Sequence, residues 1–302
     1  MTNVTHQDVQ VVDNVVELVD GLDRTSDSSR FQWRSADPIE HFQLEANPFA
    51  DNVNPDFFFR TESHEEAFIL MKKAVEDNAA LALCTALSGT GKTLLTQILL
   101  QELDQTKCRT ILILVYPNMS RTALLRDVLT ELDIEPPRPG LSIGALLALI
   151  QEEIIRLYRT GKKLVLIIDE AHFLKTDTLH VLRTLSNIEV PDKKLISVLL
   201  FGEDHFRKRL DHRTYRALLS RMFIRSTIAP LSTEEVEQYI KFRCLMAGGR
   251  GDLFTEDAHA RIAERTNGVP REVNRLAHNA MLAAARKGLK QVTAEVVNTV
   301  AR

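Results

Sequence analysis

The sequence predicts a doubly wound α/β domain, with a parallel sheet flanked by helices, followed by a small helical domain. Near-continuous apolar runs of strand length alternate with helical patterns as far as residue 230, and only helical patterns follow. Continuous apolarity is typical of parallel strands buried on both faces, and strands that alternate with helices indicate a doubly wound sheet. With 302 residues, 44% of them hydrophobic, the chain has enough apolar material for about two domains.

Each element of the α/β domain follows from a local pattern. Strands are predicted at residues 79–86, 109–116, 163–169, 194–201 and 223–230. Apolar residues at helical spacing predict helices at residues 94–103, 121–132, 143–158 and 177–187. A further helix precedes the first strand, because Ser63 and Glu66 form a capping box that opens an apolar-periodic run through Val75.

The last 70 or so residues contain three helical segments. The first, "STEEVEQYIKFRCLMAGG", begins with a capping pattern and ends at two glycines, and "TEDAHARIAERTNG" and "PREVNRLAHNAMLAAARKG" follow the same rule. We therefore expect an α/β core at residues 46–230 and a helical lid domain at residues 231–302.

Residues 1–45 have a different character. They contain nine acidic residues and three arginines, a balance of −6, with little periodic apolar content. Such a composition predicts a mobile acidic tail. The valine-rich segment at residues 9–19 is its best candidate for docking an unknown protein partner, although a solubilising leader is the simpler interpretation.

Charge and cysteine usage exclude several classes. The net charge is −3, so no global field attracts nucleic acid or anionic lipid, and DNA binding would need a local basic patch. Cys84, Cys108 and Cys244 lie far apart in the sequence, which argues against a zinc site or a disulfide framework. Without a membrane-length apolar run or a signal-peptide pattern, we expect a cytoplasmic protein that does not insert directly into a membrane.

The segment "SGTGKT" (residues 88–93) follows the first predicted strand and opens a helix, which is the context of a phosphate-binding loop. Glycines at 89 and 91 let backbone N–H groups face a phosphate, Lys92 can reach the β and γ oxygens of ATP, and the Thr93 hydroxyl can bind Mg²⁺. The predicted nucleotide-binding residues of this loop are Ser88, Gly89, Thr90, Gly91, Lys92, Thr93 and Leu94. Ala86 stands where the usual pattern has its first glycine.

Two carboxylates end the strand "LVLIIDE" at the sheet edge where ligands of open α/β sheets bind. Asp169 is expected to hold Mg²⁺ through water, and Glu170 to activate the attacking water as general base. Adjacent carboxylates favour hydrolysis over transfer to a substrate hydroxyl, and no guanine-reading NKxD motif occurs in the sequence. These features together predict an Mg²⁺-dependent ATPase.

Arginines complete the predicted site. Arg271, in "GVPREVN", lies in the first turn of a lid helix, from which it can reach toward the γ-phosphate. Arg216 and Arg221, with Arg213 behind them, are candidates for an arginine finger that acts on the nucleotide of a neighbouring subunit. If one of them is the finger, activity depends on assembly into a homo-oligomer.

From about residue 47 to the end, the chain resembles the ExeA/GspA type of AAA+ ATPase, a secretion-associated family of P-loop NTPases. The resemblance rests on "NPF", "SGTGKTLL", "YPNMS", "LVLIIDEAHFL", "LRTLSNIE", "KLISVLLFGEDHF", "LLSRMFIRSTIAPLS" and "NGVPREVNRLAHNAML". It implies ATP hydrolysis by an oligomer, with Lys92, Thr93, Asp169, Glu170 and Arg271 in their usual roles.

The chain departs from the family at Ala86 and at Glu203, where glycine and glutamine are usual. An ionised Glu203 beside the γ-phosphate would be repelled unless a cation intervened, so we expect it to point away or the sensor to work differently. Three functions remain open: an ATPase that remodels or assembles a partner complex, such as a secretion or export machine; a DNA-associated regulator resembling the transposition ATPases; and a slow ATP-dependent scaffold or switch.

Overall fold

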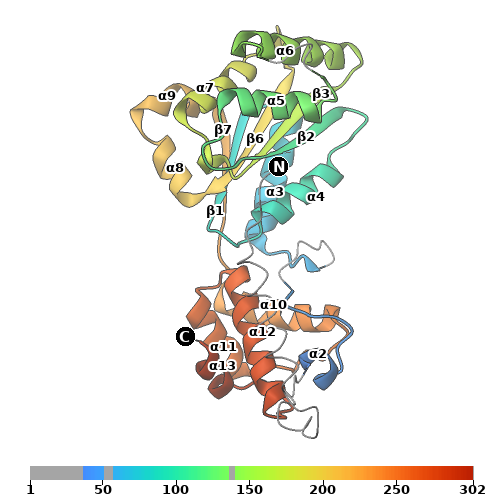
Figure 1. The fold of residues 1–302 in the computed structure, drawn as a ribbon, viewed down its shortest axis with the longest axis vertical. Coiled ribbons are helices and arrows are strands. Elements are labelled where there is room, and N and C mark those ends of the chain that lie inside the picture. Colours follow the sequence, from blue (N-terminus) through green and yellow to red (C-terminus); the bar gives the residue numbers. More distant parts are fainter. Residues whose placement is uncertain (1–36, 51–56, 136–139, 302) are drawn as a thin grey trace, which may run out of the picture. The chain divides into compact units, whose positions relative to one another are not determined.

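The computed structural model describes residues 37–50, 57–135 and 140–301 (Figure 1). The predicted docking segment at residues 9–19, and most of the predicted acidic tail, lie outside the described residues.

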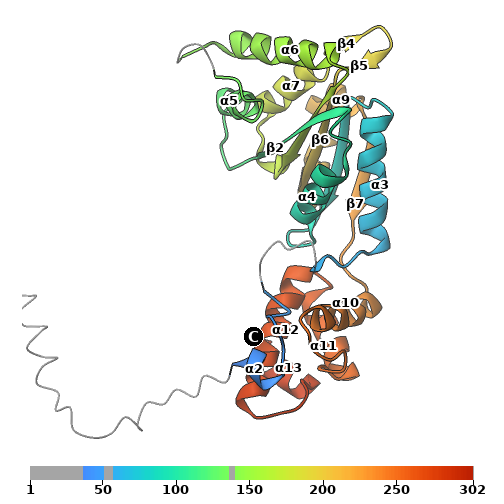
Figure 2. The ribbon, with the colours of Figure 1, turned by 90° about the vertical axis from the view of Figure 1, so that its right-hand side faces the viewer.

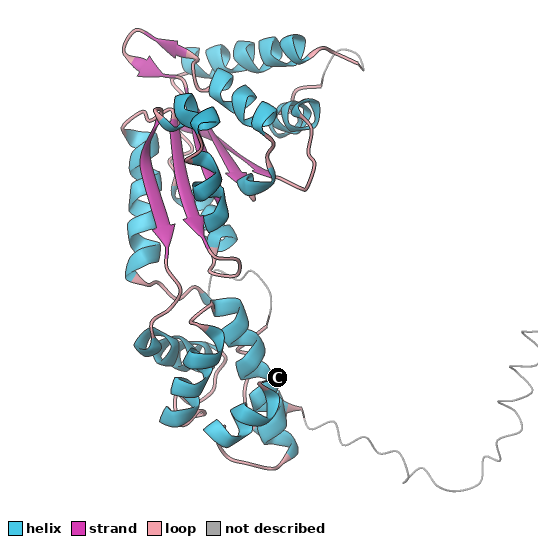
Figure 3. Ribbon diagram, turned by 90° about the vertical axis from the view of Figure 1, so that its left-hand side faces the viewer, coloured by secondary structure: helices cyan, strands magenta, loops and turns pink. Residues whose placement is uncertain are grey.

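A five-stranded parallel sheet forms the centre of the α/β part, with strand order β2-β3-β6-β1-β7. The strands are β1 (Leu81–Ala86), β2 (Cys108–Leu114), β3 (Lys163–Asp169), β6 (Ile196–Glu203) and β7 (Met222–Ile228). Every residue of β1 and β3 is buried, as their continuous apolarity predicts. The parallel sheet is therefore confirmed, and the arrows of its strands point the same way in Figure 3.

Helices cover both faces of this sheet. On one face, α3 (Glu62–Glu76) and α4 (Lys92–Glu102) pack against residues of β1 such as Ala82 and Cys84. On the other face, α5 (Arg121–Glu131), α6 (Ile143–Arg159) and α7 (Thr176–Leu185) pack with Leu81 and Leu83. Figure 2 shows α3 and α5 on opposite sides of the sheet, which confirms the doubly wound arrangement.

The structure corrects the predicted start of α3. Its N-cap is Thr61, whose hydroxyl accepts a hydrogen bond from the backbone N–H of His64, and not Ser63. The helix therefore begins earlier than the capping pattern indicates, and Ser63 lies inside its first turn. The next residue, His64, is buried and contacts the phosphate loop.

Two further segments differ from the predicted pattern. Residues 193–194 form β5 (Lys193–Lys194), which pairs with β4 (Glu189–Val190) in a small antiparallel hairpin, so the sheet strand begins at Ile196. The arginine-rich stretch before β7 folds into α8 (Asp204–Leu210), the short helix η3 (Arg213–Tyr215) and α9 (Arg216–Leu219).

After β7 the described residues form the three predicted helices, α10 (Thr233–Met246), α11 (Glu256–Thr266) and α12 (Pro270–Arg286). A further helix, α13 (Ala294–Val300), was not predicted. Ser232 and Glu235 form the expected capping box at the start of α10. Residues 37–45 differ from the tail predicted for them, because α2 (Pro38–His41) and Leu44 pack against the helical part, whose core includes Leu44. The N–H of Glu45 also donates to the carbonyl of Ala247 at 2.8 Å.

Gly268 fixes the approach of α12 to the end of the sheet. Its φ is +69°, and an added Cβ would lie 1.9 Å from the carbonyl oxygen of Leu231. The same close approach lets the N–H of Leu231 donate to the Gly268 carbonyl at 2.9 Å. Only glycine combines this left-handed conformation with such a contact, which explains the glycine of "GVPR" two residues before α12.

Lys163 is a buried cation at the start of β3, with 5% of its surface exposed. Its Nζ donates to the carbonyl of Val75 at 3.0 Å and to Oδ1 of Asn78 at 3.2 Å. Burial lowers the pKa of Lys163 from 10.5 to about 8. Between these values the folded chain binds fewer protons at this site than the unfolded chain, so the contribution of Lys163 to stability rises with pH.

We therefore expect the free energy of unfolding of the wild type to rise, relative to Lys163→Met, by up to about 1.4 kcal/mol per pH unit between the folded and unfolded pKa values. Denaturant unfolding at pH 7.5, 8.5 and 9.5 measures the difference. Burial raises the pKa of the Cys108 thiol, which acts in the opposite direction, and this thiol interacts with Lys163, so both proteins carry Cys108→Ala in the comparison. Parallel pH profiles for the two proteins would show that Lys163 does not titrate in this range.

Candidate active site

The segment between β1 and α4 forms a compact loop with two left-handed glycines. Gly89 has φ +81° and Gly91, the N-cap of α4, has φ +100°. Ala86 is the last residue of β1 and is not among the residues with positive φ in the described chain. The alanine at this position therefore imposes no left-handed strain, because its backbone belongs to the strand.

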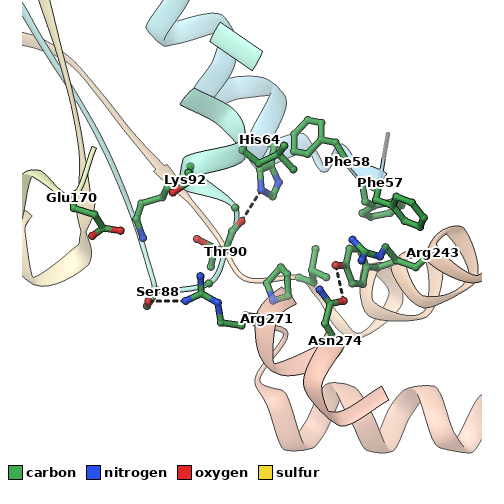
Figure 4. A pocket seen from close by; sticks show the side chains of 18 residues that line it. Phe57, Phe58, His64, Ser88, Thr90, Lys92, Glu170, Arg243, Arg271 and Asn274 are labelled. Carbon is green, nitrogen blue, oxygen red and sulfur yellow. Dashed lines mark hydrogen bonds between the residues drawn. The ribbon is translucent and has the colours of Figure 1, made fainter. Parts of the chain in front are cut away.

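Lys92 begins α4 and is 4% exposed. Its Nζ donates to the carbonyls of Leu87 at 3.0 Å and Ala86 at 3.3 Å, which places the ammonium group on the inner side of the loop. Figure 4 shows this side chain between the loop and Glu170. An ammonium group has three N–H donors, so one remains for an anion.

Thr93 and Asp169 come together from different elements. The Thr93 hydroxyl donates to Oδ2 of Asp169 at 2.8 Å, and Oδ1 of Asp169 accepts from the backbone N–H of Glu170 at 2.8 Å. Asp169 is 1% exposed, at the carboxyl end of β3. The structure thus brings together the two residues predicted as magnesium ligands, and their hydroxyl and carboxylate oxygens suit a hard cation.

Glu170 follows β3 in a left-handed conformation, with φ 56° and ψ 33°. This conformation costs a non-glycine residue about 1–2 kcal/mol and is typical of residues held for a function. Burial, and secondly the charge of Asp169, raise the pKa of the Glu170 carboxyl. A raised pKa makes this carboxylate a better proton acceptor than an exposed glutamate.

The loop, Glu170 and α12 line a cavity of about 380 Å³. Arg271, in the first turn of α12, donates its N–H to the carbonyl of Gly89 at 3.2 Å, and its Nη1 lies 3.5 Å from the Ser88 hydroxyl (Figure 4). An added Cβ on Gly89 would lie 2.7 Å from Cβ of Arg271, so this contact requires glycine in the loop. The predicted site residues that line the cavity are Ser88, Gly89, Thr90, Gly91, Lys92, Thr93, Leu94, Glu170 and Arg271.

His64 is a residue of the site that the sequence reasoning missed. Its Nε2 donates to the carbonyl of Thr90 at 2.9 Å, and its Nδ1 accepts from the Thr61 hydroxyl at 2.7 Å. The tautomer follows because a carbonyl oxygen can only accept. Burial lowers the pKa of His64, which favours the neutral ring. The hydrogen bond from Nε2 ties the loop to α3. No short motif in the sequence marks this contact.

Replacing His64 by alanine is expected to lower the free energy of unfolding by about 1–3 kcal/mol, because the buried carbonyl of Thr90 loses its donor. His64→Gln is the matched control, since its amide N–H can replace Nε2 and should restore part of the stability. Chemical denaturation of the three proteins measures the effect. Equal stability of His64→Ala and the wild type would show that the contact does not hold the loop.

Aromatic side chains line the part of the cavity away from Glu170. Phe57, Phe58 and Phe59 belong to its lining, together with Tyr239 and Arg243. The Arg243 guanidinium lies 4.7 Å from the centre of the Phe57 ring, and Phe58 packs edge-on against His64. This end of the cavity can therefore take a planar apolar group.

The remaining predicted residues lie elsewhere. Neither Arg216 nor Arg221 lines the cavity. Arg216 is exposed at the start of α9, and Arg221 donates to Oδ1 of Asn187. Glu203 ends β6, and its Oε2 lies 3.3 Å from Nδ1 of His205. It is also absent from the cavity lining, in agreement with the expectation that it points away.

No helix within the described residues is both long enough and apolar enough to span a bilayer.

Comparisons with known proteins bear on the family of this chain. Residues 75–210 match the family model described as an AAA domain. General secretion pathway protein A of Aeromonas hydrophila is 30% identical over 254 residues, which cover 84% of this chain and 46% of that protein. This domain match and this relative support the predicted resemblance to the ExeA/GspA type of AAA+ ATPase. It spans about half the length of the curated relative that it matches.

Solved structures share the AAA+ fold of this chain at lower identity. The ORC2 protein of Aeropyrum pernix, solved in ADPNP-ADP complexes, has a TM-score of 0.64 and 14% identity over 85% of this chain and 71% of its own. Cdc6p of Pyrobaculum aerophilum has a TM-score of 0.63 and 22% identity over 81% and 67% of the two chains. The RuvB Holliday junction branch migration motor of Thermotoga maritima has a TM-score of 0.54 and 20% identity over 83% and 72%. These likenesses confirm the predicted fold class.

Proposed function

We propose that this AAA+ protein binds Mg²⁺ and ATP in the cavity between the phosphate loop and α12, and that it hydrolyses the ATP. The observation that carries the proposal is the convergence of Lys92, Thr93, Glu170 and Arg271 on one cavity, with Asp169 hydrogen-bonded to Thr93. These groups come from the loop, from the end of β3 and from α12.

The phosphates would bind at the loop. Gly89 and Gly91 adopt left-handed conformations that leave backbone N–H groups free to turn toward an anion, and the N-terminus of α4 adds its positive dipole end. Lys92 would contribute a charge to the β and γ oxygens. The aromatic end of the cavity, near Phe57 and Phe58, would receive the adenine.

Mg²⁺, when bound, neutralises charge on the β and γ phosphates. Thr93 would hold this ion through its hydroxyl and Asp169 through a water molecule. Glu170 would accept a proton from the attacking water, and Arg271 would contact the γ-phosphate from α12. Both Glu170 and Arg271 line the same cavity, as this division of roles requires.

We propose further that the chain acts as a homo-oligomer, ring or filament, in which Arg216 or Arg221 reaches the nucleotide of a neighbour. Arg216 is exposed and outside its own cavity, which supports a role in trans. The energy of hydrolysis would remodel or assemble a partner complex. The likeness to a general secretion pathway protein supports a secretion or export machine. We further propose the cytoplasm as the compartment and the N-terminal segment as the docking element.

The experiment that tests hydrolysis compares phosphate release by the wild type, Thr93→Ala and Thr93→Ser over a range of Mg²⁺ concentrations. We expect Mg²⁺-dependent release, a loss of at least about tenfold in Thr93→Ala, and recovery in Thr93→Ser because serine keeps the hydroxyl. Release that needs no Mg²⁺, or that is equal in all three proteins, would contradict the proposal.

A DNA-associated ATPase is the second candidate. Exposed basic residues on α8, η3 and the start of α9 support it: Arg207, Lys208, Arg213 and Arg216. Such a patch would bind phosphates without base specificity, with an affinity that falls as salt rises. DNA binding that requires ATP and weakens with salt would favour this candidate, and no binding at low salt would dismiss it.

A slow scaffold or switch is the third candidate, since the departures from the family pattern at Ala86 and Glu203 could slow hydrolysis. The structure gives it little support, because Ala86 adopts a strand conformation and Glu203 lies against His205 outside the cavity. Tight ATP binding with almost no phosphate release would still select this function.

A further inference from the structure

Three side chains with metal-binding atoms meet beside the proposed nucleotide site. His172 lies in the short helix η2 (Ala171–Phe173) after β3, Glu203 ends β6, and His205 lies in the first turn of α8. One ligand atom from each falls within 4.8 Å of the other two. None of the three residues lines the nucleotide cavity.

We propose that His172, Glu203 and His205 form a binding site for a zinc ion. Two imidazoles and one carboxylate are ligands that suit Zn²⁺, and three protein ligands leave a fourth position for water. The proposed magnesium residues, Thr93 and Asp169, present only oxygen atoms. The two sites therefore select different cations by their ligand chemistry.

The state of the His172 ring supports this assignment independently. His172 is only 6% exposed, and its Nδ1 is buried without a hydrogen-bond partner among the described residues. Oε2 of Glu170 lies 3.2 Å away, but not in a geometry that makes a hydrogen bond. Buried polar atoms without partners are rare in folded proteins, and a ligand is one explanation for such an atom.

Hydrogen bonds from Arg209 fix the backbone of the segment that carries His172. Arg209 donates to the carbonyl of His172 at 2.9 Å and to the carbonyl of Leu174 at 2.7 Å. The His172 ring packs against Phe173 and lies edge-on to His205, with ring centres 4.1 and 5.0 Å apart. These contacts hold the backbone and the ring of His172 in one position.

The other two ligands have room to close around an ion. Ligand atoms of one tetrahedral zinc ion lie about 3.4 Å apart, given bonds of about 2.1 Å. The side chains of His205 and Glu203 are 58% and 31% exposed, and Oε2 of Glu203 is already 3.3 Å from Nδ1 of His205. Rotation of these two side chains toward the fixed His172 would complete the site.

Zinc at this site would also change the surroundings of Glu203. Its carboxylate would be neutralised by the ion, which removes a negative charge that acts on Glu170. The site also adjoins Glu170, because Nδ1 of His172 lies 3.2 Å from Oε2 of Glu170. This link to turnover rests on the proposed function, whereas the zinc site itself does not.

The test is calorimetric titration of ZnCl₂ into the full chain without nucleotide or Mg²⁺. We expect one zinc ion per chain at this site, with affinity at least about tenfold lower in His205→Ala and in Glu203→Gln. His212→Ala is the matched control, since His212 is an exposed histidine in the same region and its replacement should leave the zinc affinity unchanged. Titration with Co²⁺ should give visible absorption bands in the wild type that His205→Ala loses.

His205 is exposed, so its replacement is not expected to unfold the chain. Absence of zinc binding in the wild type would overturn the proposal. Equal affinity in the wild type, His205→Ala and Glu203→Gln would overturn it as well, because any zinc bound would then lie elsewhere. Neither result would affect the test of ATP hydrolysis, which uses Mg²⁺ and different residues.

Discussion

Replacing Glu170 by glutamine is expected to slow ATP hydrolysis by about 10²–10⁴-fold while ATP binding persists. Glutamine keeps the size of the side chain but cannot accept the proton of the attacking water. The left-handed backbone of Glu170 and the hydrogen bond from its N–H to Asp169 do not depend on the carboxylate, so the rest of the site should survive. Phosphate release measures hydrolysis, and titration with ATP measures binding.

Glu102→Gln is the matched control, because Glu102 is an exposed residue at the end of α4. It should release phosphate at the wild-type rate. Undiminished release by Glu170→Gln would remove Glu170 from the mechanism. Loss of both binding and hydrolysis would instead assign it to the binding of ATP or to the integrity of the loop.

Replacing the arginine finger by alanine is expected to slow turnover by about 10³–10⁵-fold, and Arg216 and Arg221 are the two candidates. Neither side chain lines its own cavity, so the affinity of each variant for ATP should change little. A finger that acts in trans also predicts rescue. Mixing the inactive arginine variant, whose cavity is intact, with Glu170→Gln, whose arginines are intact, should restore part of the activity.

Arg159→Ala serves as the control, because Arg159 is exposed at the end of α6, far from α9 in the sequence. Wild-type turnover in both Arg216→Ala and Arg221→Ala would contradict the proposed role of these residues. A loss that mixing does not restore would indicate a structural defect; for Arg221 this defect would be the lost hydrogen bond to Asn187.

Much of the fold could be predicted because its strands are buried on both faces. The seven residues of β3 are all buried, and the apolar run at residues 164–168 predicted the strand. The helices at residues 204–219 were harder to predict, because their buried residues, Phe206, Leu210, Tyr215 and Leu218, are separated by arginines and a lysine. Short helices of this kind depend on tertiary packing more than on local pattern.

The residues of the site also divide into those that a local sequence pattern predicts and those that depend on tertiary contacts. Lys92, Thr93, Asp169 and Glu170 belong to short contiguous motifs whose place at the end of a strand is fixed by the fold. His64 binds the carbonyl of a residue 26 positions away, and such a contact leaves no local pattern in the sequence.

Glu203 shows the same limit. Its departure from the family pattern was visible in the sequence, but its approach to His205 and His172 required the structure.

The central claim is that the cavity beside the phosphate loop binds ATP. Calorimetric titration of ATP with Mg²⁺ into the wild type, Lys92→Ala and Lys107→Ala tests it most directly, because Lys107 is 80% exposed and serves as a charge-matched control. We predict one ATP per chain in the wild type and in Lys107→Ala, and an affinity at least about tenfold lower in Lys92→Ala, because a charged hydrogen bond to phosphate is lost. No binding by the wild type, or equal binding by all three proteins, would contradict the claim.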